Sequence, residues 1–302
     1  MIDIAFLGTG AMMPTSTRWL SSMLIRLGDQ LALFDVGEGT QIPWREQGWG
    51  LRRLSLICLS HHHADHIAGI PGVLIGLANA ERTEPLTIIG PKGTRALVTG
   101  LREAVPVLPY DLRVADLAPG NTWAWADMAI SVTAGIHRGP VLLYRFDLPR
   151  SPRFLVEQAE AMGAPRESWS QLAHGEDVMA DGRLWRSSDF VGGSRLGISF
   201  GIMTDTRPTE QAAEHFRGSD LLVAEGTYGD EGDLANAIQN KHMTFAEAAT
   251  FARDAGARRL ILTHFSPKML APADYLENAT RVFPDAQLAT PGLELTLNYP
   301  DH

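Results

Sequence analysis

Short apolar runs recur along the whole chain, each bounded by glycine, proline or aspartate. They are rich in leucine, isoleucine and valine, and each has the length of a β-strand. The strands expected from this pattern are 4–7, 23–27, 31–34, 54–59, 86–89, 130–133, 141–146, 197–203, 221–223, 260–263 and 293–297. The early part of the chain is therefore predicted to be strand-rich, with strands and helices alternating afterwards.

Helical segments are expected between several of these strands, at 67–79, 93–104, 154–162, 208–216 and 244–255. The clearest signal is at the last one. Thr244 and Glu247 have the spacing of a capping box, and Gly256 follows as a stop signal. Sheets bury their apolar faces most readily under helices, so the pattern predicts an α/β protein.

The stretch from Leu148 to Arg195 differs from the rest of the chain because strand signals are absent and proline and glycine are frequent. It is too long for a simple connector. We expect a protruding insertion, and the alternative is a surface loop without a function.

Composition is ordinary for a soluble globular enzyme, with 45% hydrophobic and 20% charged residues among 302. This length predicts one or two domains. The net charge of −9 argues against a general nucleic-acid binder. Cys58 is the single cysteine, so no intramolecular disulfide can form. The chain shows neither a signal-peptide pattern nor an apolar run that could span a membrane, so we expect no membrane partner and a cytoplasmic location.

Histidines gather directly after the predicted strand 54–59, in the run from His61 to His66. Alternate residues face the same side of an extended chain, so His61 and His63 should point together, whereas His62 should point away and pack elsewhere. Asp65 and His66 follow at the turn into a helix. Imidazole and carboxylate donors without a thiolate suit zinc, manganese or iron.

Three further ligand-type residues each follow the end of a predicted strand: His137, Asp205 and His264. Together with the histidine run, they predict a site that loops build on a sheet scaffold, with enough donors for a second metal. The remaining histidines outside any motif are expected at the surface. They are His174, His215 and His302.

At this point the chain resembles ribonuclease Z, a family of the metallo-β-lactamase superfamily that trims the 3′ end of precursor tRNA. The resemblance runs nearly from end to end and rests on an ordered set of motifs. These are Phe6–Gly10 with Pro14-Thr15, Phe34–Gln41, Ser60–Gly72, His137-Arg138, Glu225, Lys241–Thr244 and His264–Ser266. It implies the metallo-β-lactamase fold, a four-layer αββα sandwich, as a single domain over 1–302 with an inserted arm at about 148–195.

The resemblance also assigns roles to the candidate residues. One divalent metal would be held by His61, His63 and His137, and a second by Asp65, His66 and His264, with Asp205 bridging the two. Zinc is the first choice of metal, with manganese and iron as alternatives. A hydroxide between the two cations would attack phosphorus while the metals neutralise charge on the phosphoryl oxygens.

Three catalytic roles follow from the same resemblance. Asp65 would accept a proton from the attacking water, and His242, oriented by Glu225, would protonate the leaving ribose 3′-oxygen. Asp35 would support the metal-binding loops, with formation of a turn as the alternative. The substrate implied is precursor tRNA, cut by a homodimer whose arms each reach the tRNA held by the partner subunit.

The chain departs from the family pattern at four places. Thr204 stands before Asp205 where the family has glycine, Lys268-Met269 replaces Arg-Tyr, and the runs 139–145 and 163–167 differ. Across the predicted arm, six basic residues face seven acidic ones, so little counterion release is expected on RNA binding.

Two other functions therefore remain open. One is a phosphodiesterase or related hydrolase that acts on a small ester with the same two metals. The other is a scaffold of the same fold without catalytic activity.

Overall fold

The computed structural model describes residues 1–300. The chain divides into two compact units. The larger comprises 1–147 and 199–297, and the smaller comprises 148–198 together with 298–300. The candidate ligands and the Glu225–His242 pair all belong to the larger unit, and His302 lies outside the described residues.

One seven-stranded mixed sheet of the larger unit is formed mainly by the first part of the chain. Its order is β16 (Glu294–Leu297), β1 (Ile2–Gly8), β2 (Ser22–Leu27), β3 (Gln30–Phe34), β4 (Leu54–Cys58), β5 (Leu86–Pro91) and β6 (Leu112–Leu117). Strands β1, β2, β3 and β16 pair antiparallel, and β3 to β6 pair parallel.

A second seven-stranded sheet is formed by the rest of the chain, and β9 and β12 also extend into the smaller unit. Its order is β15 (Ala286–Leu288), β14 (Leu260–Thr263), β13 (Leu221–Glu225), β12 (Arg195–Met203), β9 (Leu142–Arg150), β8 (Met128–Ala134) and β7 (Thr122–Trp125). Strands β12 to β15 run parallel, so their carboxyl ends meet at one edge of this sheet.

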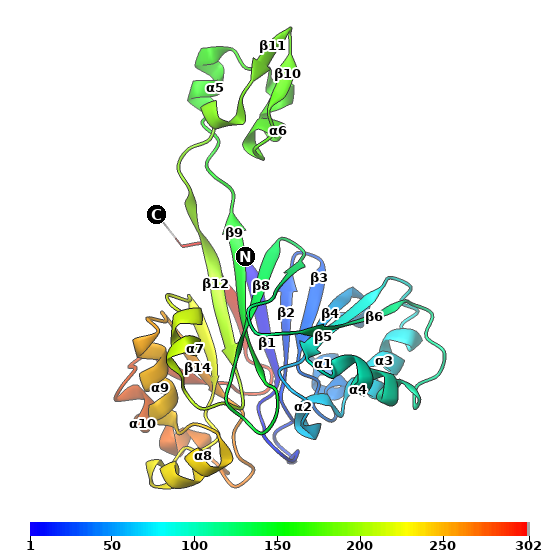
Figure 1. Ribbon diagram of the computed structural model, residues 1–302, viewed down its shortest axis with the longest axis vertical. Coiled ribbons are helices and arrows are strands. Elements are labelled where there is room, and N and C mark those ends of the chain that lie inside the picture. Colours follow the sequence, from blue (N-terminus) through cyan, green and yellow to red (C-terminus); the bar gives the residue numbers. More distant parts are fainter. Residues whose placement is uncertain (301–302) are drawn as a thin grey trace. The chain divides into compact units, whose positions relative to one another are not determined.

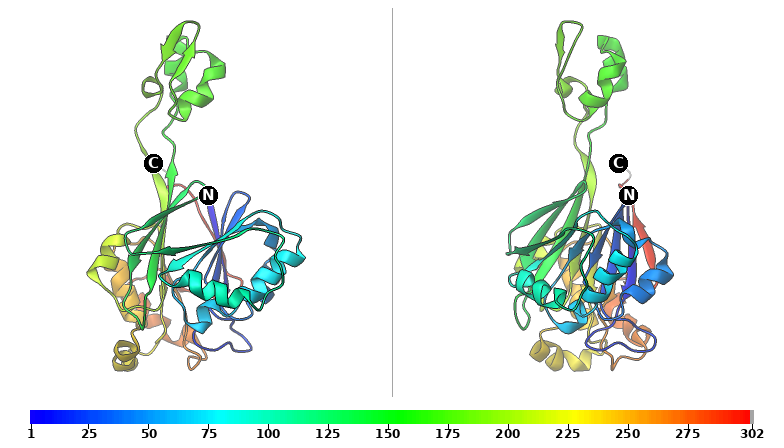
Figure 2. Two further views of the ribbon diagram at one scale, coloured as in Figure 1. Left: turned by 45° about the vertical axis from the view of Figure 1, so that its right-hand side comes forward. Right: turned by 90° about the vertical axis from the view of Figure 1, so that its right-hand side faces the viewer.

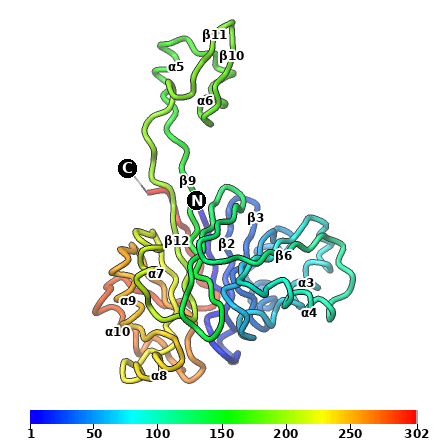
Figure 3. Tube along the Cα trace, viewed as in Figure 1, coloured from blue at the N-terminus to red at the C-terminus, as the bar shows by residue number. Residues whose placement is uncertain are grey.

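Helices cover the outer face of each sheet in the larger unit (Figures 1 and 2). They are α1 (Gln41–Gln47), α3 (Ile70–Asn79) and α4 (Thr94–Arg102) on the first sheet, and α7 (Glu210–His215), α9 (Phe245–Asp254) and α10 (Leu276–Thr280) on the second. The short helices α2 (Ala64–Ile67) and α8 (Leu234–Asn240) lie at the lower end of the larger unit in Figure 1, and 3-10 turns occur at Leu51–Arg53, Glu231–Asp233 and Pro272–Tyr275. One apolar core packs α1, α3 and α4 on the first sheet, and another packs α7, α9 and α10 on the second. Phe34 of β3 and Tyr144 of β9 meet edge to face, 5.3 Å apart. The order is helix, sheet, sheet, helix, so the predicted four-layer fold is confirmed.

Two local predictions can be checked closely. The capping box at α9 is present, since Thr244 and Glu247 bond reciprocally. The helix expected over 67–79 is interrupted, because α2 ends at Ile67 and α3 begins at Ile70. Gly69 lies at the break, and a Cβ there would come within 2.2 Å of the Gly37 carbonyl oxygen. The break therefore lets the chain pass close to the loop that follows β3.

The smaller unit has an apolar core of its own, built around Leu172, Trp185 and Phe190. The chain enters it at the end of β9 and leaves it along β12 (Figure 3). Its elements are α5 (Val156–Met162), α6 (Trp169–Ala173), β10 (Val178–Ala180), β11 (Arg183–Trp185) and short 3-10 turns at Arg166–Ser168 and Ser187–Asp189. The expectation of no strand in 148–195 is wrong, because β10 and β11 pair as an antiparallel hairpin.

None of the helices in the described part of the chain is long and apolar enough to cross a bilayer.

A candidate dinuclear metal centre

The candidate ligands all lie just past strand ends of the larger unit. His61 and His63 follow β4, and Asp65 and His66 lie on the short helix α2. His137 follows β8, and Asp205 and His264 follow the carboxyl ends of β12 and β14. Both sheets therefore contribute donors to one place, although the residues are far apart in sequence.

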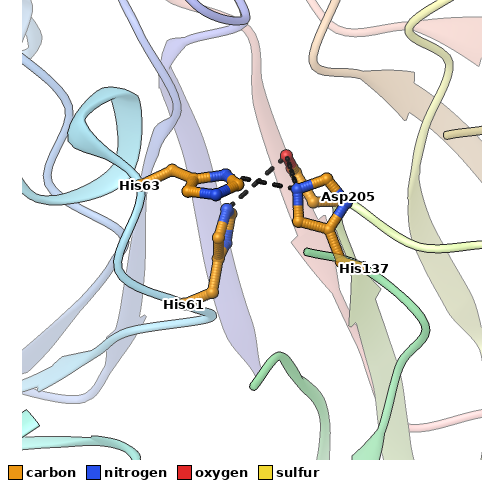
Figure 4. A group of neighbouring side chains, drawn as sticks. All are labelled: His61, His63, His137 and Asp205. Atoms are coloured by element: carbon orange, nitrogen blue, oxygen red, sulfur yellow. Dashed lines mark hydrogen bonds and ion pairs between the residues drawn. The ribbon is translucent and has the colours of Figure 1, made fainter. Parts of the chain in front are cut away.

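A first group of donors consists of His61, His63, His137 and Asp205, whose side chains point toward one another (Figure 4). The Nε2 atom of His137 is 3.2 Å from Nδ1 of His63. Oδ2 of Asp205 lies 3.6 Å from Nε2 of His61 and 3.7 Å from Nε2 of His137. One donor atom of each residue therefore lies within 4.8 Å of the others.

A second group consists of Asp65, His66 and His264. The Nε2 atoms of His66 and His264 are 3.2 Å apart, and each is 3.6 Å from Oδ2 of Asp65. The other oxygen of Asp205, Oδ1, lies 3.3 Å from Nε2 of His66 and 3.1 Å from Nε2 of His264. The two oxygens of Asp205 thus face different groups, as a bridging carboxylate requires.

These distances fit divalent cations. Donors about 2.0–2.1 Å from a tetrahedral zinc ion are roughly 3.3 Å from one another, which is close to the separations found in both groups. Nε2 of His61 is buried and has no hydrogen-bond partner among the described residues. A buried polar atom of this kind needs a partner, and a metal ion in the first group would supply one.

Asp35 holds the second group in place, as expected. Its Oδ2 accepts a hydrogen bond from Nδ1 of His66 at 2.7 Å and another from the Ser60 hydroxyl at 2.8 Å. That hydroxyl in turn lies 3.0 Å from Nδ1 of His61. Bonds at Nδ1 direct Nε2 of both rings toward the centre, which is the usual way that proteins orient metal-binding histidines.

The backbone bends sharply at three of these residues. Asp35, Asp205 and His264 have φ values of 54°, 48° and 60°, in the left-handed region that residues other than glycine seldom adopt. Such strain concentrates at functional sites. At Asp205 the departure from the family pattern adds a contact, since the Thr204 hydroxyl donates to Oδ1 of Asp205 at 2.6 Å.

Beside the second group lies the pair formed by Glu225 and His242. Nδ1 of His242 is 3.1 Å from Oε2 of Glu225, and the Thr227 hydroxyl donates to the same oxygen at 2.6 Å. That hydroxyl also lies 3.0 Å from Nδ1 of His264. A ring nitrogen of His242 also falls within 4.8 Å of donor atoms of Asp205 and His264, so His242 borders the centre.

Electrostatics prepare His61 and Asp205 for metal binding, but not His66. Burial and the neighbouring histidines hold the pKa of His61 well below its ordinary value, so it is neutral and its Nε2 can act as a donor. Burial opposes ionisation of Asp205, yet the histidines around its carboxylate, including His66, outweigh burial and hold its pKa well below the ordinary value. Metal ligands must be deprotonated, and these two groups are. At His66, burial disfavours the charged form, yet Asp205 and Asp35 outweigh burial and hold its pKa well above the ordinary value, so a metal ion has to displace a proton there.

His242, in contrast, is held in its protonated state. Burial disfavours its charged form, but the charge and the hydrogen bond of Glu225 outweigh burial and raise its pKa to about 9. Glu225 itself is fully buried, and the charge of His242 offsets that burial and lowers its pKa. The pair is therefore ionised near neutral pH, with a proton available on His242 for donation.

Among the described residues, the histidines expected to lie outside the site do so. His62 turns away from the cluster and its Nε2 bonds the Thr94 hydroxyl at 2.9 Å. His174 is exposed, but His215 is only half-buried at the surface, and its Nε2 is enclosed by protein. Cys58 is buried, as predicted.

Three residues that the sequence analysis gave no role prove to tie the loops together. Thr227 links Glu225 to His264, as described above. The backbone carbonyl of Lys241 accepts from Nδ1 of His137 at 3.3 Å, and its Nζ donates to the His137 carbonyl at 3.0 Å.

Arg207 is the third. Its guanidinium donates to the His242 carbonyl at 2.5 Å and forms a two-point ion pair with Glu247, one bond of which measures 2.8 Å. No sequence signal marks these contacts, because each joins residues far apart in the chain.

Comparison with known proteins agrees with this geometry. Residues 21–175 match the family model of the metallo-beta-lactamase superfamily, and 180–265 match that of the beta-lactamase superfamily domain. The chain is 40% identical to a ribonuclease Z of Lachnoclostridium phytofermentans over 99% of both chains, and 38% identical to one of Clostridium botulinum over the whole of both. The crystal structure of the short form of human tRNase Z matches with a TM-score of 0.69 at 23% identity, covering 99% of this chain and 100% of that one. That structural likeness concerns the fold alone.

Proposed function

We infer that this chain, which belongs to the ribonuclease Z family of the metallo-β-lactamase superfamily, is a metal-dependent endoribonuclease that removes the 3′ trailer of precursor tRNA. The observation that carries the proposal is the juxtaposition of the two donor groups with the ionised Glu225–His242 pair. The donor groups suit phosphodiester hydrolysis, and the pair supplies a proton donor beside them.

We assign each donor group one divalent ion, with zinc as the first choice and manganese or iron as alternatives. His61, His63 and His137 would hold the first, Asp65, His66 and His264 the second, and Asp205 would bridge them. When bound, two such ions supply Lewis acidity, which makes water a stronger nucleophile and stabilises charge on the phosphoryl oxygens.

The chain's own residues would supply the proton transfers. Asp65 accepts a bond from the Met12 backbone N–H at 2.7 Å through Oδ2, which fixes the carboxylate that takes a proton from the attacking water. His242 carries the proton for the ribose 3′-oxygen that leaves, and Glu225 keeps His242 charged and oriented.

The rest of the assignment follows the family. We propose a single domain with the segment 148–195 as an inserted arm, a homodimer as the working form, and the cytoplasm as its location. The neutral charge balance of the arm supports weaker RNA binding by this segment than a basic one would give.

The test is cleavage of a precursor tRNA by metal-loaded protein. A single cut immediately after the discriminator nucleotide, abolished by a chelator, is the expected result. Hydrolysis of small chromogenic diesters without any cut in precursor tRNA would instead establish a phosphodiesterase that acts on a small ester. The near-neutral arm and Lys268 favour this second function. Metal analysis that finds about two ions per chain, together with hydrolysis, excludes a silent scaffold.

A further inference from the structure

The cavity over the candidate centre extends beyond the donors. Its volume is about 450 Å³, which is sufficient for a nucleotide. Five of the donors and His242 line it. A further part of the lining, called here the Tyr228 wall, comprises Tyr228 and three residues of α8 and its approach, namely Asp233, Asn236 and Asn240, together with Arg138.

Tyr228 is held rigidly at this wall. Its backbone N–H donates to the Met243 carbonyl at 3.2 Å, and its carbonyl accepts from the Phe245 N–H at 3.0 Å. Its hydroxyl accepts a hydrogen bond from the Asn240 amide at 2.8 Å. Asn240 is fixed in turn by Arg138, whose guanidinium donates to its Oδ1 at 3.1 Å.

The part of the Tyr228 wall around Asp233 is unsuited to a phosphate group. Oδ1 of Asp233 accepts a bond from the Asn236 amide at 2.8 Å. A carboxylate repels a second anion, whereas it tolerates the neutral base and ribose of a nucleotide. Arg138, which follows His137 in the chain, and Lys268 are the cations in the cavity lining that are available for a phosphate.

The position of Tyr228 decides which nucleotide would bind. Its ring centroid is 6.4 Å from that of His242. His242 protonates the leaving 3′-oxygen in the proposed mechanism, so groups beside it border the nucleotide that bears this oxygen. That nucleotide becomes the 3′ end of the product.

We propose that Tyr228, steadied by Asn240 and Arg138, forms a stacking subsite for the base of the nucleotide on the 5′ side of the scissile phosphate. Every base has a π-face, so the subsite takes any of the four bases and recognises a base rather than a sequence. The inference rests on the proposed function, since it uses the role of His242 to choose the nucleotide.

The experiment uses metal-loaded full-length protein and a small diester without a nucleobase, methyl 4-nitrophenyl phosphate, as the reporter substrate. Two inhibitors are compared: the dinucleotide ApA with a free 3′-hydroxyl, and its counterpart with an abasic ribose at the 3′ position. We expect ApA to inhibit roughly five- to 150-fold better than the abasic compound, as stacking of one base allows.

The variants locate the effect. Tyr228→Leu should bring the ratio of the two inhibition constants close to one, and the matched control Tyr228→Phe, which keeps the ring, should preserve it. Dinucleotides with other 3′ bases should inhibit the wild type within a few-fold of one another, purines best. Because each comparison is a ratio within one protein, a general loss of activity in a variant cancels out.

Equal inhibition by ApA and its abasic counterpart in the wild type would overturn the subsite, whether or not Tyr228→Leu folds. An undiminished ratio in Tyr228→Leu would overturn the assignment to Tyr228. Failure of the proposed function looks different, because precursor tRNA then stays intact while the inhibition ratio still reports on the subsite.

Discussion

The charge of His242 can be tested by replacing Glu225 with glutamine. The substitution keeps the shape of the side chain and an oxygen to accept the Thr206 N–H bond, which measures 2.7 Å. It removes the negative charge that outweighs burial and raises the pKa of His242 to about 9. Without that charge, only Asp205 and Asp65 oppose burial, so the pKa should fall toward its ordinary value of 6.5.

The size of the effect depends on pH. With a pKa of about 9, roughly nine-tenths of His242 is protonated at pH 8, but with 6.5 only about 3% is, so Glu225→Gln should lower cleavage about 30-fold. At pH 6 most of His242 is protonated in both proteins, and the loss should shrink to less than about twofold. Bound cations would lower the pKa of His242 in wild type and in Glu225→Gln alike. The quantity to compare is therefore the shift between the pH–rate profiles of the two proteins.

The assay is single-turnover cleavage of precursor tRNA from pH 5.5 to 9.5, with metal content measured at each pH. The matched control is Glu231→Gln, because Glu231 accepts a bond from the Ala246 N–H and makes no contact with His242. Its ratio to wild type should be flat across the range. A flat ratio for Glu225→Gln as well would refute the argument that Glu225 acts through the charge of His242.

Three further substitutions have defined outcomes. Asp35→Ala removes the acceptor that orients a ligand imidazole and should weaken metal binding roughly 10- to 100-fold in a chelator competition, and unchanged affinity would contradict that role. Thr204→Val removes the hydroxyl that donates to the Asp205 carboxylate and should weaken metal binding about tenfold in the same titration. Tighter metal binding would contradict a supporting role for this hydroxyl. Arg207→Met should keep both metals and KM but lower kcat about tenfold, because the carbonyl of His242 loses its anchor, and added guanidinium should restore part of the rate. Loss of metal in that variant would show that Arg207 supports the ligands instead. In metal-free protein, the raised pKa of His242 stabilises the fold below pH 6.5, and the advantage of wild type over Glu225→Gln in Tm should fade as pH rises through about 9.

Much of the fold followed from apolar patterning, because the strands of the sheet interiors are buried on both faces. All eleven expected strands are present. The pattern succeeded at one sheet edge, β16, and failed at the other three, β6, β7 and the three-residue β15. Strand β6 carries Arg113 and Asp116 and is only partly buried, and β7 is short and half exposed, so neither looks apolar. The three-residue strands β10 and β11 are too short to show a period.

The metal-donor residues of the site could be predicted from the sequence, but the residues that hold its loops together could not. Donor residue types cluster in sequence or follow strand ends, and both signals can be read from one chain. Arg207, Lys241 and Thr227 act through contacts with residues up to 104 positions away. Arginine, lysine and threonine are common surface residues, and only the folded chain shows that these three join the loops.

The division of the donors between two sheets has a consequence for synthesis on the ribosome. His66 and His264, whose nitrogens meet at 3.2 Å, are 198 residues apart. A nascent chain that has released the early histidine run and strand β4 still lacks His137, Asp205 and His264. Neither donor group can close until the carboxyl-terminal sheet has emerged, so a truncated or stalled product carries a loose cluster of histidines and no hydrolytic centre.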